Sequence, residues 1–171
     1  MPTTSLAELP IRQVLEMISS DTIAPGAGAA GAVTLGLAAA CAAKAVAISM
    51  KHSREAARLA ASLSALGKIR SFALQGADAD SSAFAEFLQH KDLAAAARLI
   101  ETGGALVNLA DALTTLIGDL ELHVSSNMSG DLSAAKALAA AARHIQSSND
   151  AEAKKEQRAM SESARSRRND P

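Results

Sequence analysis

The chain has 171 residues, a length that fits one domain with a sizeable hydrophobic core. Its 17 Lys and Arg balance 18 Asp and Glu, so no net charge favours nucleic acid or an anionic membrane surface as a partner. Aromatic residues make up 2% of the chain, too few for a base-stacking surface. The one cysteine, Cys41, excludes an intrachain disulfide and suits a reducing compartment. Because the start also lacks a secretory signal pattern, we expect a cytoplasmic protein.

The first predicted helix runs from about Leu9 to Ser19 and has Pro10 in its opening turn. Its apolar residues recur at helical spacing and share one face: Ile11, Val14, Leu15 and Ile18. A loop follows from Asp21 to Gly28, where glycine permits a tight backbone conformation.

The chain is organised around the stretch from Ala24 to Met50, which is rich in alanine and glycine and contains one charge, Lys44. Alanine is the best helix former, and a helix that is apolar on every side must be surrounded by protein or lipid. The stretch is long enough to span a membrane, but Leu, Ile and Val are sparse in it and no Trp or Tyr flanks it. We therefore expect the central helix of a bundle, with free N–H groups at its start that suit an anion or a polar ligand edge.

Helical spacing of apolar residues predicts a third helix that extends to about His90, with a bend at Gly76. Asp92 caps a fourth helix, in which four leucines recur every seven residues and mark a seam between long helices: Leu99, Leu106, Leu113 and Leu120. Gly103 and Gly104 predict a kink or a close contact in that helix.

The residues SSNMSG (125–130) form a loop, and Asp131 starts an alanine-rich fifth helix that ends near Ser148. No alternating β pattern occurs, so the fold class is all-α, with about five helices in a long antiparallel bundle. Residues 1–148 form the helical domain. Residues 149–171 are charged and poor in apolar side chains, which predicts a frayed or disordered tail.

Asp80 is the residue that departs most informatively from this pattern, because it falls on the apolar stripe of the third helix, one turn before Phe84. A carboxylate there must be hydrogen-bonded, paired or open to a pocket, and its pKa is open to the perturbation that acid–base catalysis requires. The plainer interpretation is a structural carboxylate that faces a gap or caps a neighbouring helix. Asp78 lies off the stripe and is expected in solvent.

Two further polar groups have a structural and a functional interpretation. Lys51 and Arg54 follow the central helix and either stabilise its C-terminus or bind an anionic substrate tail. Asn127 and Asp131 either form a turn and a cap or orient a substrate. The four histidines lack the spacing of metal ligands, so no metal site is predicted.

Three motifs together resemble the formiminotransferase-cyclodeaminase and methenyltetrahydrofolate cyclohydrolase family: the APG-x-G loop at residues 24–28, D-x-x-A-F at 80–84, and N-x-x-x-D at 127–131. The resemblance covers about residues 8–148. It implies a homodimer of long antiparallel helices with a folate site near the glycine loop, a tetrahydrofolate derivative as substrate and no tightly bound cofactor. It assigns catalysis to Asp80 and substrate binding to the loop and the two polar groups: Pro25, Gly26, Ala27, Gly28, Lys51, Arg54, Asn127 and Asp131.

The chain departs from the family pattern at four small residues, where the family usually has a glycine or a polar side chain: Ala27, Ala29, Ala47 and Gly130. Two functions therefore stay open. The first is an enzyme that hydrolyses methenyltetrahydrofolate to formyltetrahydrofolate or cyclodeaminates formiminotetrahydrofolate. The second is a non-catalytic helical dimer of the same fold that binds a ligand or a partner protein.

Overall fold

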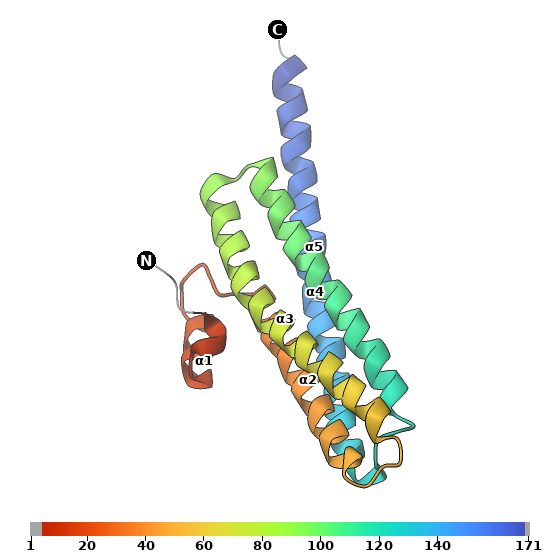
Figure 1. Ribbon diagram of the computed structural model, residues 1–171. Helices are drawn as coiled ribbons and strands as arrows, with labels where there is room; N and C mark the ends of the chain where they lie inside the picture. Colours follow the sequence, from red (N-terminus) through yellow and green to blue (C-terminus); the bar gives the residue numbers. More distant parts are fainter. Residues whose placement is uncertain (1–4, 170–171) are drawn as a thin grey trace.

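The computed structural model describes residues 5–169, which form five α-helices and two short 3₁₀ helices (Figure 1). The α-helices are α1 (Ile11–Ile18), α2 (Ala27–Met50), α3 (Ala56–His90), α4 (Leu93–Leu120) and α5 (Ser129–Asn169). The 3₁₀ helices are η1 (Leu6–Glu8) and η2 (Ser126–Met128). Within the described part of the chain, the predicted all-α fold is confirmed.

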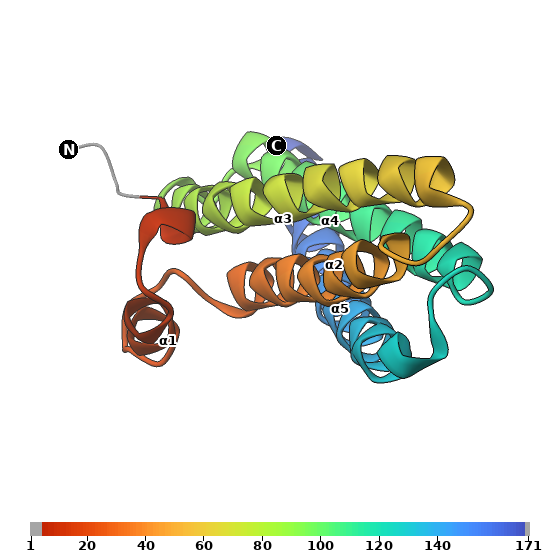
Figure 2. The same ribbon diagram turned by 60° about the horizontal axis from the view of Figure 1, so that its bottom comes forward.

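The four long helices α2 to α5 form an antiparallel bundle in which each helix packs against two neighbours (Figures 1 and 2). α2 lies against α3 and α5, and α4 completes the ring between these two. The side chains of α2 are small, so the flanking helices approach its backbone closely, and many of its alanines are fully buried. α2 therefore has the close packing that its composition predicts, but it is one of four helices in a ring and is not surrounded on every side.

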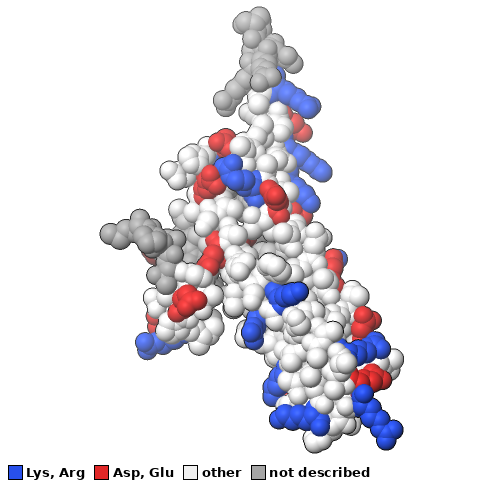
Figure 3. Space-filling model, viewed as in Figure 1, with Lys and Arg blue, Asp and Glu red and all other residues white. Residues whose placement is uncertain are grey.

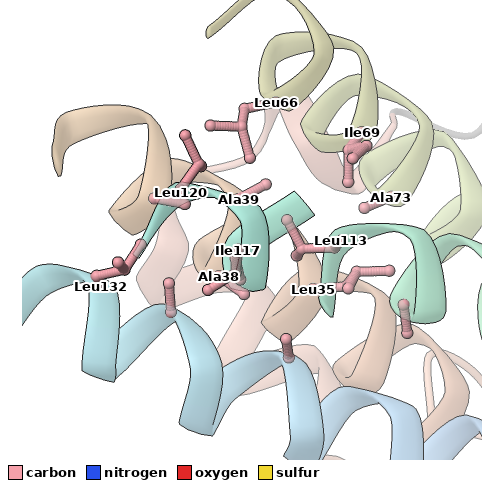
Figure 4. Close-up of a cluster of buried hydrophobic side chains, with 14 of the residues drawn as sticks. Leu35, Ala38, Ala39, Leu66, Ile69, Ala73, Leu113, Ile117, Leu120 and Leu132 are labelled. Atoms are coloured by element: carbon pink, nitrogen blue, oxygen red, sulfur yellow. The ribbon is translucent and has the colours of Figure 1, made fainter. Parts of the chain in front are cut away.

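The main core fills the middle of this bundle with leucine, isoleucine and alanine side chains from all four long helices (Figure 4). Of the leucines that repeat every seven residues in α4, Leu106, Leu113 and Leu120 are buried, and Leu99 is half-buried. Asp92 caps α4 as predicted, because its carboxylate accepts a hydrogen bond from the Ala95 N–H at 2.7 Å.

Two glycines within the helices lie where helices pack together. α3 runs unbroken through Gly76, where a bend was expected. A Cβ at Gly76 would lie 2.5 Å from Leu106 Cδ2, so the missing side chain makes room for α4. In α4, a Cβ at Gly103 would lie 3.7 Å from the Asp150 Cβ of α5, which is an ordinary van der Waals distance. Gly103 therefore lies next to α5, but the packing there does not require a glycine.

The C-terminal region differs from the expectation of a frayed or disordered tail beginning at residue 149. α5 continues without a break to Asn169, the last residue that the structure describes, and residues 170–171 of the predicted tail lie outside the described residues. Ala153 is buried, and Met160 packs on a second cluster formed by Phe87, Ala95 and Ala96. The tail is helical because these few apolar side chains pack on the ends of α3 and α4. The prediction of disorder rested on the overall charge of the tail and did not take these side chains into account.

η1 lies against α3 at the side of the bundle, and α1 stands apart from the four long helices (Figure 1). Asp78 holds this segment: its carboxylate accepts hydrogen bonds from the Leu6 N–H at 2.8 Å and the Ser5 hydroxyl at 2.5 Å. The expectation that Asp78 is simply solvated is therefore wrong. On α1, Val14 is buried, but Ile11 and Leu15 are 60% and 59% exposed.

Two helices, α2 and α4, have the length and hydropathy of membrane-spanning segments. In this fold, half of the most apolar window of α2 is buried against the rest of the bundle. Such burial is what the core helix of a bundle requires, so the apolar run of α2 is accounted for by packing.

Candidate functional site

A pocket of about 240 Å³ opens where the start of α2 meets α3, α4 and α5. Gly26, Ala27 and Gly28 contribute its backbone edge. The N-cap residue Gly26 has no side chain to cap the start of α2, and of the N–H groups in the first turn that of Ala29 faces the Asp80 carboxylate. These amides carry the partial positive charge of a helix N-terminus, which favours the oxygen atoms of a ligand.

Asp80 lies in the wall of this pocket and is only 7% exposed. It belongs to the inward-facing stripe of α3, where Phe84 and Phe87 follow it at helical spacing and line the same pocket. Burial raises the pKa of the Asp80 carboxyl from 3.8 to about 6, and a hydrogen bond from the Ala29 N–H partly opposes that rise. The group is therefore mostly ionised at pH 7 and half-protonated near pH 6, so it can take up and return a proton close to neutral pH, as an acid–base catalyst needs to do.

Gly28 is the reason that the carboxylate can approach the helix start. A Cβ at Gly28 would collide with both carboxylate oxygens and with the carboxyl carbon of Asp80. At Gly26, by contrast, a Cβ would meet no other atom within 4 Å. The structure thus brings the predicted catalytic aspartate and the predicted glycine loop into direct contact.

Gln146 of α5 fixes the backbone at Gly28 from the other side. Its Nε2 donates a hydrogen bond to the Gly28 carbonyl at 2.7 Å, and the side chain is fully buried. Gly31 makes space for it, since a Cβ there would lie 2.8 Å from Nε2. Gln146 was not among the predicted site residues. Its sequence signal is a polar side chain at helical spacing among buried alanines of α5: Ala135, Ala139, Ala142, Gln146 and Ala153.

The sequence analysis also missed the contribution of the C-terminal region to the pocket. Asp150, Glu152 and Glu156 line it together with Asp80, whereas no Lys, Arg or His of the described chain does. The apolar part of the lining comes chiefly from α3 and α4. The pocket therefore combines apolar walls with carboxylates, a lining suited to a flat ring that carries N–H donors or positive charge.

The remaining predicted binding residues do not meet at this pocket. Pro25 is buried but lines a separate groove with Asp78. Lys51, Arg54 and Asn127 are exposed and lie at the far end of α2, about 36 Å along the helix axis from Gly26.

Two contacts tie that far end together. Ser49 Oγ accepts a hydrogen bond from the Ser125 N–H at 2.9 Å, which holds the loop before α5 against the end of α2. Asp131 pairs with Lys44 at 2.9 Å. Lys and Arg gather at this end of the molecule, the lower end in Figure 3. One chain therefore does not bring together all the predicted substrate-binding residues. The length of α2 separates the glycine loop from the residues at the far end: Lys51, Arg54, Asn127 and Asp131.

No three His, Cys, Asp or Glu side chains between residues 5 and 169 are arranged to hold a metal ion. Cys41 is half-buried on α2 and packs against the main core. It lies outside the lining of the pocket.

Comparison with known proteins agrees with this architecture. The family model described as formiminotransferase-cyclodeaminase matches residues 10–149. The formiminotetrahydrofolate cyclodeaminase of Thermotoga maritima superposes with a TM-score of 0.84 over 88% of this chain and 81% of that chain, at 17% sequence identity. At that identity the likeness concerns the fold. No curated protein matches the sequence.

Proposed function

We propose that this chain, which belongs to the formiminotransferase-cyclodeaminase family, is a folate one-carbon enzyme with its active site in the pocket at the start of α2. The observation that carries the proposal is the position of Asp80, buried in the pocket wall against Gly28. The substrate is a tetrahydrofolate derivative, and the reaction is hydrolysis of the methenyl form or cyclodeamination of the formimino form. We propose that neither reaction uses a tightly bound cofactor.

In hydrolysis, the methenyl carbon is part of a cationic amidinium group and is already electrophilic. Ionised Asp80 stabilises this cation and takes one proton from a water molecule as the water oxygen bonds to the carbon. The carbon–nitrogen bond on one side then breaks, and Asp80 returns its proton to the leaving ring nitrogen. The second proton of the water goes to solvent, and formyltetrahydrofolate is the product.

In cyclodeamination, the same carboxylate serves a ring closure. A ring nitrogen of the folate bonds to the formimino carbon, and Asp80 takes the proton that this nitrogen loses. The formimino group enters in its protonated, cationic form, so its terminal nitrogen already carries two hydrogens. Asp80 then delivers the proton to this nitrogen as its bond to carbon breaks, so that ammonia leaves and the cationic methenyl form remains. Both reactions need a carboxyl group that exchanges a proton near neutral pH, which a pKa of about 6 provides.

The test is Asp80→Asn in the full chain, assayed by the absorbance decay of methenyltetrahydrofolate and by ammonia release from formiminotetrahydrofolate. We expect kcat to fall by about 10²–10⁴-fold, the usual contribution of one acid–base group. Asp78→Asn is the matched control, since it makes the same change two residues away, outside the pocket. Unchanged turnover in Asp80→Asn would remove Asp80 from the mechanism.

The wild-type protein separates this proposal from the alternative. If it binds a tetrahydrofolate derivative in a thermal-shift titration but does not accelerate decay of the methenyl form above the uncatalysed rate, the chain is a non-catalytic helical dimer that binds a ligand. The exposed apolar side chains of Ile11 and Leu15 on α1 are the observation that favours an interaction role.

We further propose that the chain is a homodimer in the cytoplasm. Large apolar side chains are exposed on α2 and α3 as well as around α1, and covering them would favour association: Ile11, Leu15, Ile23, Leu37 and Phe72. Light scattering coupled to size-exclusion chromatography would give twice the mass of one 17.4 kDa chain. A mass of one chain at micromolar concentration would contradict the dimer.

A further inference from the structure

Asp150 lines the pocket and has an unused hydrogen-bond acceptor. Its side chain is 15% exposed, and its Oδ2 accepts a hydrogen bond from Lys154 Nζ at 2.6 Å. Its Oδ1 is buried and has no hydrogen-bond partner. Gly103 of α4 lies beside this carboxylate, and a Cβ there would be 4.0 Å from Oδ1. The acceptor is therefore held between α4 and α5 at the pocket, facing no donor from the protein.

An oxygen of this kind is costly to leave unpaired. Removing a polar group from water without giving it a partner destabilises the folded state, and a ligand donor at that position recovers the loss. A partly buried carboxylate also forms stronger hydrogen bonds than a neutral acceptor does. Asp150 is thus placed to select a ligand with an N–H or O–H donor.

The charge of the pocket indicates which part of the ligand enters it. Asp80, Asp150, Glu152 and Glu156 all line the pocket, and the lining includes no Lys, Arg or His from the described residues. Lys154 offsets part of the charge at Asp150, and the remaining carboxyl groups still disfavour the two carboxylates of a glutamate tail and favour a group that is cationic or rich in N–H donors. The tail then points out of the pocket toward solvent.

Apolar side chains supply the shape of the site. Phe84, Phe87 and Leu99 line the pocket beside the carboxylates, and the volume of about 240 Å³ suits one bicyclic ring system rather than a whole folate. The pterin ring of a folate carries an amino group and a ring N–H on one edge, and its reactive nitrogen on another. A pterin-sized ring therefore matches the walls, the volume and the charge.

We propose that Asp150 is a substrate-binding residue whose Oδ1 accepts a hydrogen bond from the N–H edge of the pterin ring, which orients the one-carbon unit toward Asp80. This inference rests on the proposed function. It adds α5 beyond residue 148 to the active site and places the ring, not the glutamate tail, inside the pocket.

The test compares Asp150→Ala, Asp150→Asn and the wild-type full chain by isothermal titration calorimetry with two probes. One probe is a tetrahydropterin, which has the ring alone, and the other is p-aminobenzoylglutamate, which has the tail alone. We expect Asp150→Ala to weaken tetrahydropterin binding at least tenfold and to leave the tail probe unchanged. Asp150→Asn, which retains an acceptor oxygen, should lose less. Asp119→Asn, an exposed aspartate of α4 outside the pocket, should match the wild type.

Kinetics with methenyltetrahydrofolate gives an independent readout. Loss of a contact made equally in the ground state and the transition state raises KM and leaves kcat nearly unchanged, whereas a general loss of structure lowers kcat and the melting temperature together. We expect KM to rise in Asp150→Ala, with circular dichroism and the melting temperature close to those of the wild type.

The outcomes of the two proposals are distinguishable. Turnover that depends on Asp80 but is unaffected by Asp150→Ala would overturn this inference and leave the proposed function in place. Tetrahydropterin binding that is lost in Asp150→Ala, in a wild-type protein that turns over neither folate substrate, would support the inference and overturn the enzymatic proposal. A wild-type protein that binds only the tail probe would contradict the inference directly.

Discussion

Charged side chains have opposite environments at the two ends of α2. At its start, Asp80 is buried in a pocket, and no ion pair in the described structure offsets its charge. At its other end, Lys44 pairs with Asp131 in the open, with side chains 62% and 28% exposed. Water and salt screen the second arrangement, so it contributes little to stability.

This difference indicates that the reactive carboxyl group lies at the start of α2. A carboxylate that water or a cation already satisfies has little to gain from a substrate. The carboxylate at the pocket end has been taken from water without being given a counter-ion, so its proton affinity is raised and a cationic ligand would relieve it. Substitutions at the two ends should therefore have very different consequences, in the following order.

The largest effect is expected from Gly28→Ala. The new Cβ collides with the Asp80 carboxylate, so the carboxylate must shift. A displacement of about 1 Å at a catalytic group costs about a hundredfold in rate, and overpacking costs about 1–3 kcal/mol of unfolding free energy. Turnover of methenyltetrahydrofolate and urea denaturation measure the two effects. Gly118→Ala is the control, because this glycine is exposed on α4 outside the pocket and its Cβ would meet no atom within 4 Å.

The next effect is a pH dependence of stability that belongs to Asp80. Its folded-state pKa of about 6 lies above the unfolded value of 3.8, so its favourable contribution is complete below pH 4 and is lost as the pH rises through 6. Relative to Asp80→Asn, the wild type should therefore lose about 2–3 kcal/mol of unfolding free energy between pH 4 and pH 7. Urea denaturation of both proteins across this range measures the difference. Parallel curves would mean that the carboxyl titrates normally.

A smaller loss is expected from Gln146→Leu. The substitution keeps an apolar volume of similar length but leaves the Gly28 carbonyl without its buried donor, at a cost of about 1–2 kcal/mol. Some of this loss is offset because the unpartnered Gln146 Oε1 is removed as well. Gln75→Leu, at an exposed position of α3, is the matched control. Chemical denaturation should separate the two variants, and equal stability would indicate that water readily replaces the Gln146 amide.

The smallest effects are expected at the far end of α2. Lys44→Met removes an exposed ion pair, so we expect no measurable change in the melting temperature. Lys51→Met and Arg54→Met lie far from the pocket, and we expect KM for methenyltetrahydrofolate to stay within about twofold of the wild type, since a screened charge at that distance contributes little. A clear rise in KM would show instead that the far end takes part in substrate binding, as the family resemblance implies.

Local sequence signals were enough to identify the helices and the most unusual residue of the site. Helical periodicity and alanine content located α2, α3 and α4 to within a few residues, because these signals lie within each segment. The same periodicity placed Asp80 on a buried face, and the glycine loop before α2 marked a second part of the site. Both features are properties of a single helix or loop, which a sequence displays directly.

The contacts between polar groups, by contrast, follow from the way the helices pack together. Asp78 and Asp80 are two residues apart, but α3 turns the first toward the N-terminal segment and the second toward the pocket. Asp150 reaches the pocket because α5 continues past residue 148, and Gln146 reaches the Gly28 carbonyl because α5 packs against α2. Lys51 and Asn127 stay apart from it because α2 is a straight helix of 24 residues. Such pairings depend on how helices distant in sequence dock, and that information is absent from the periodicity of any one of them.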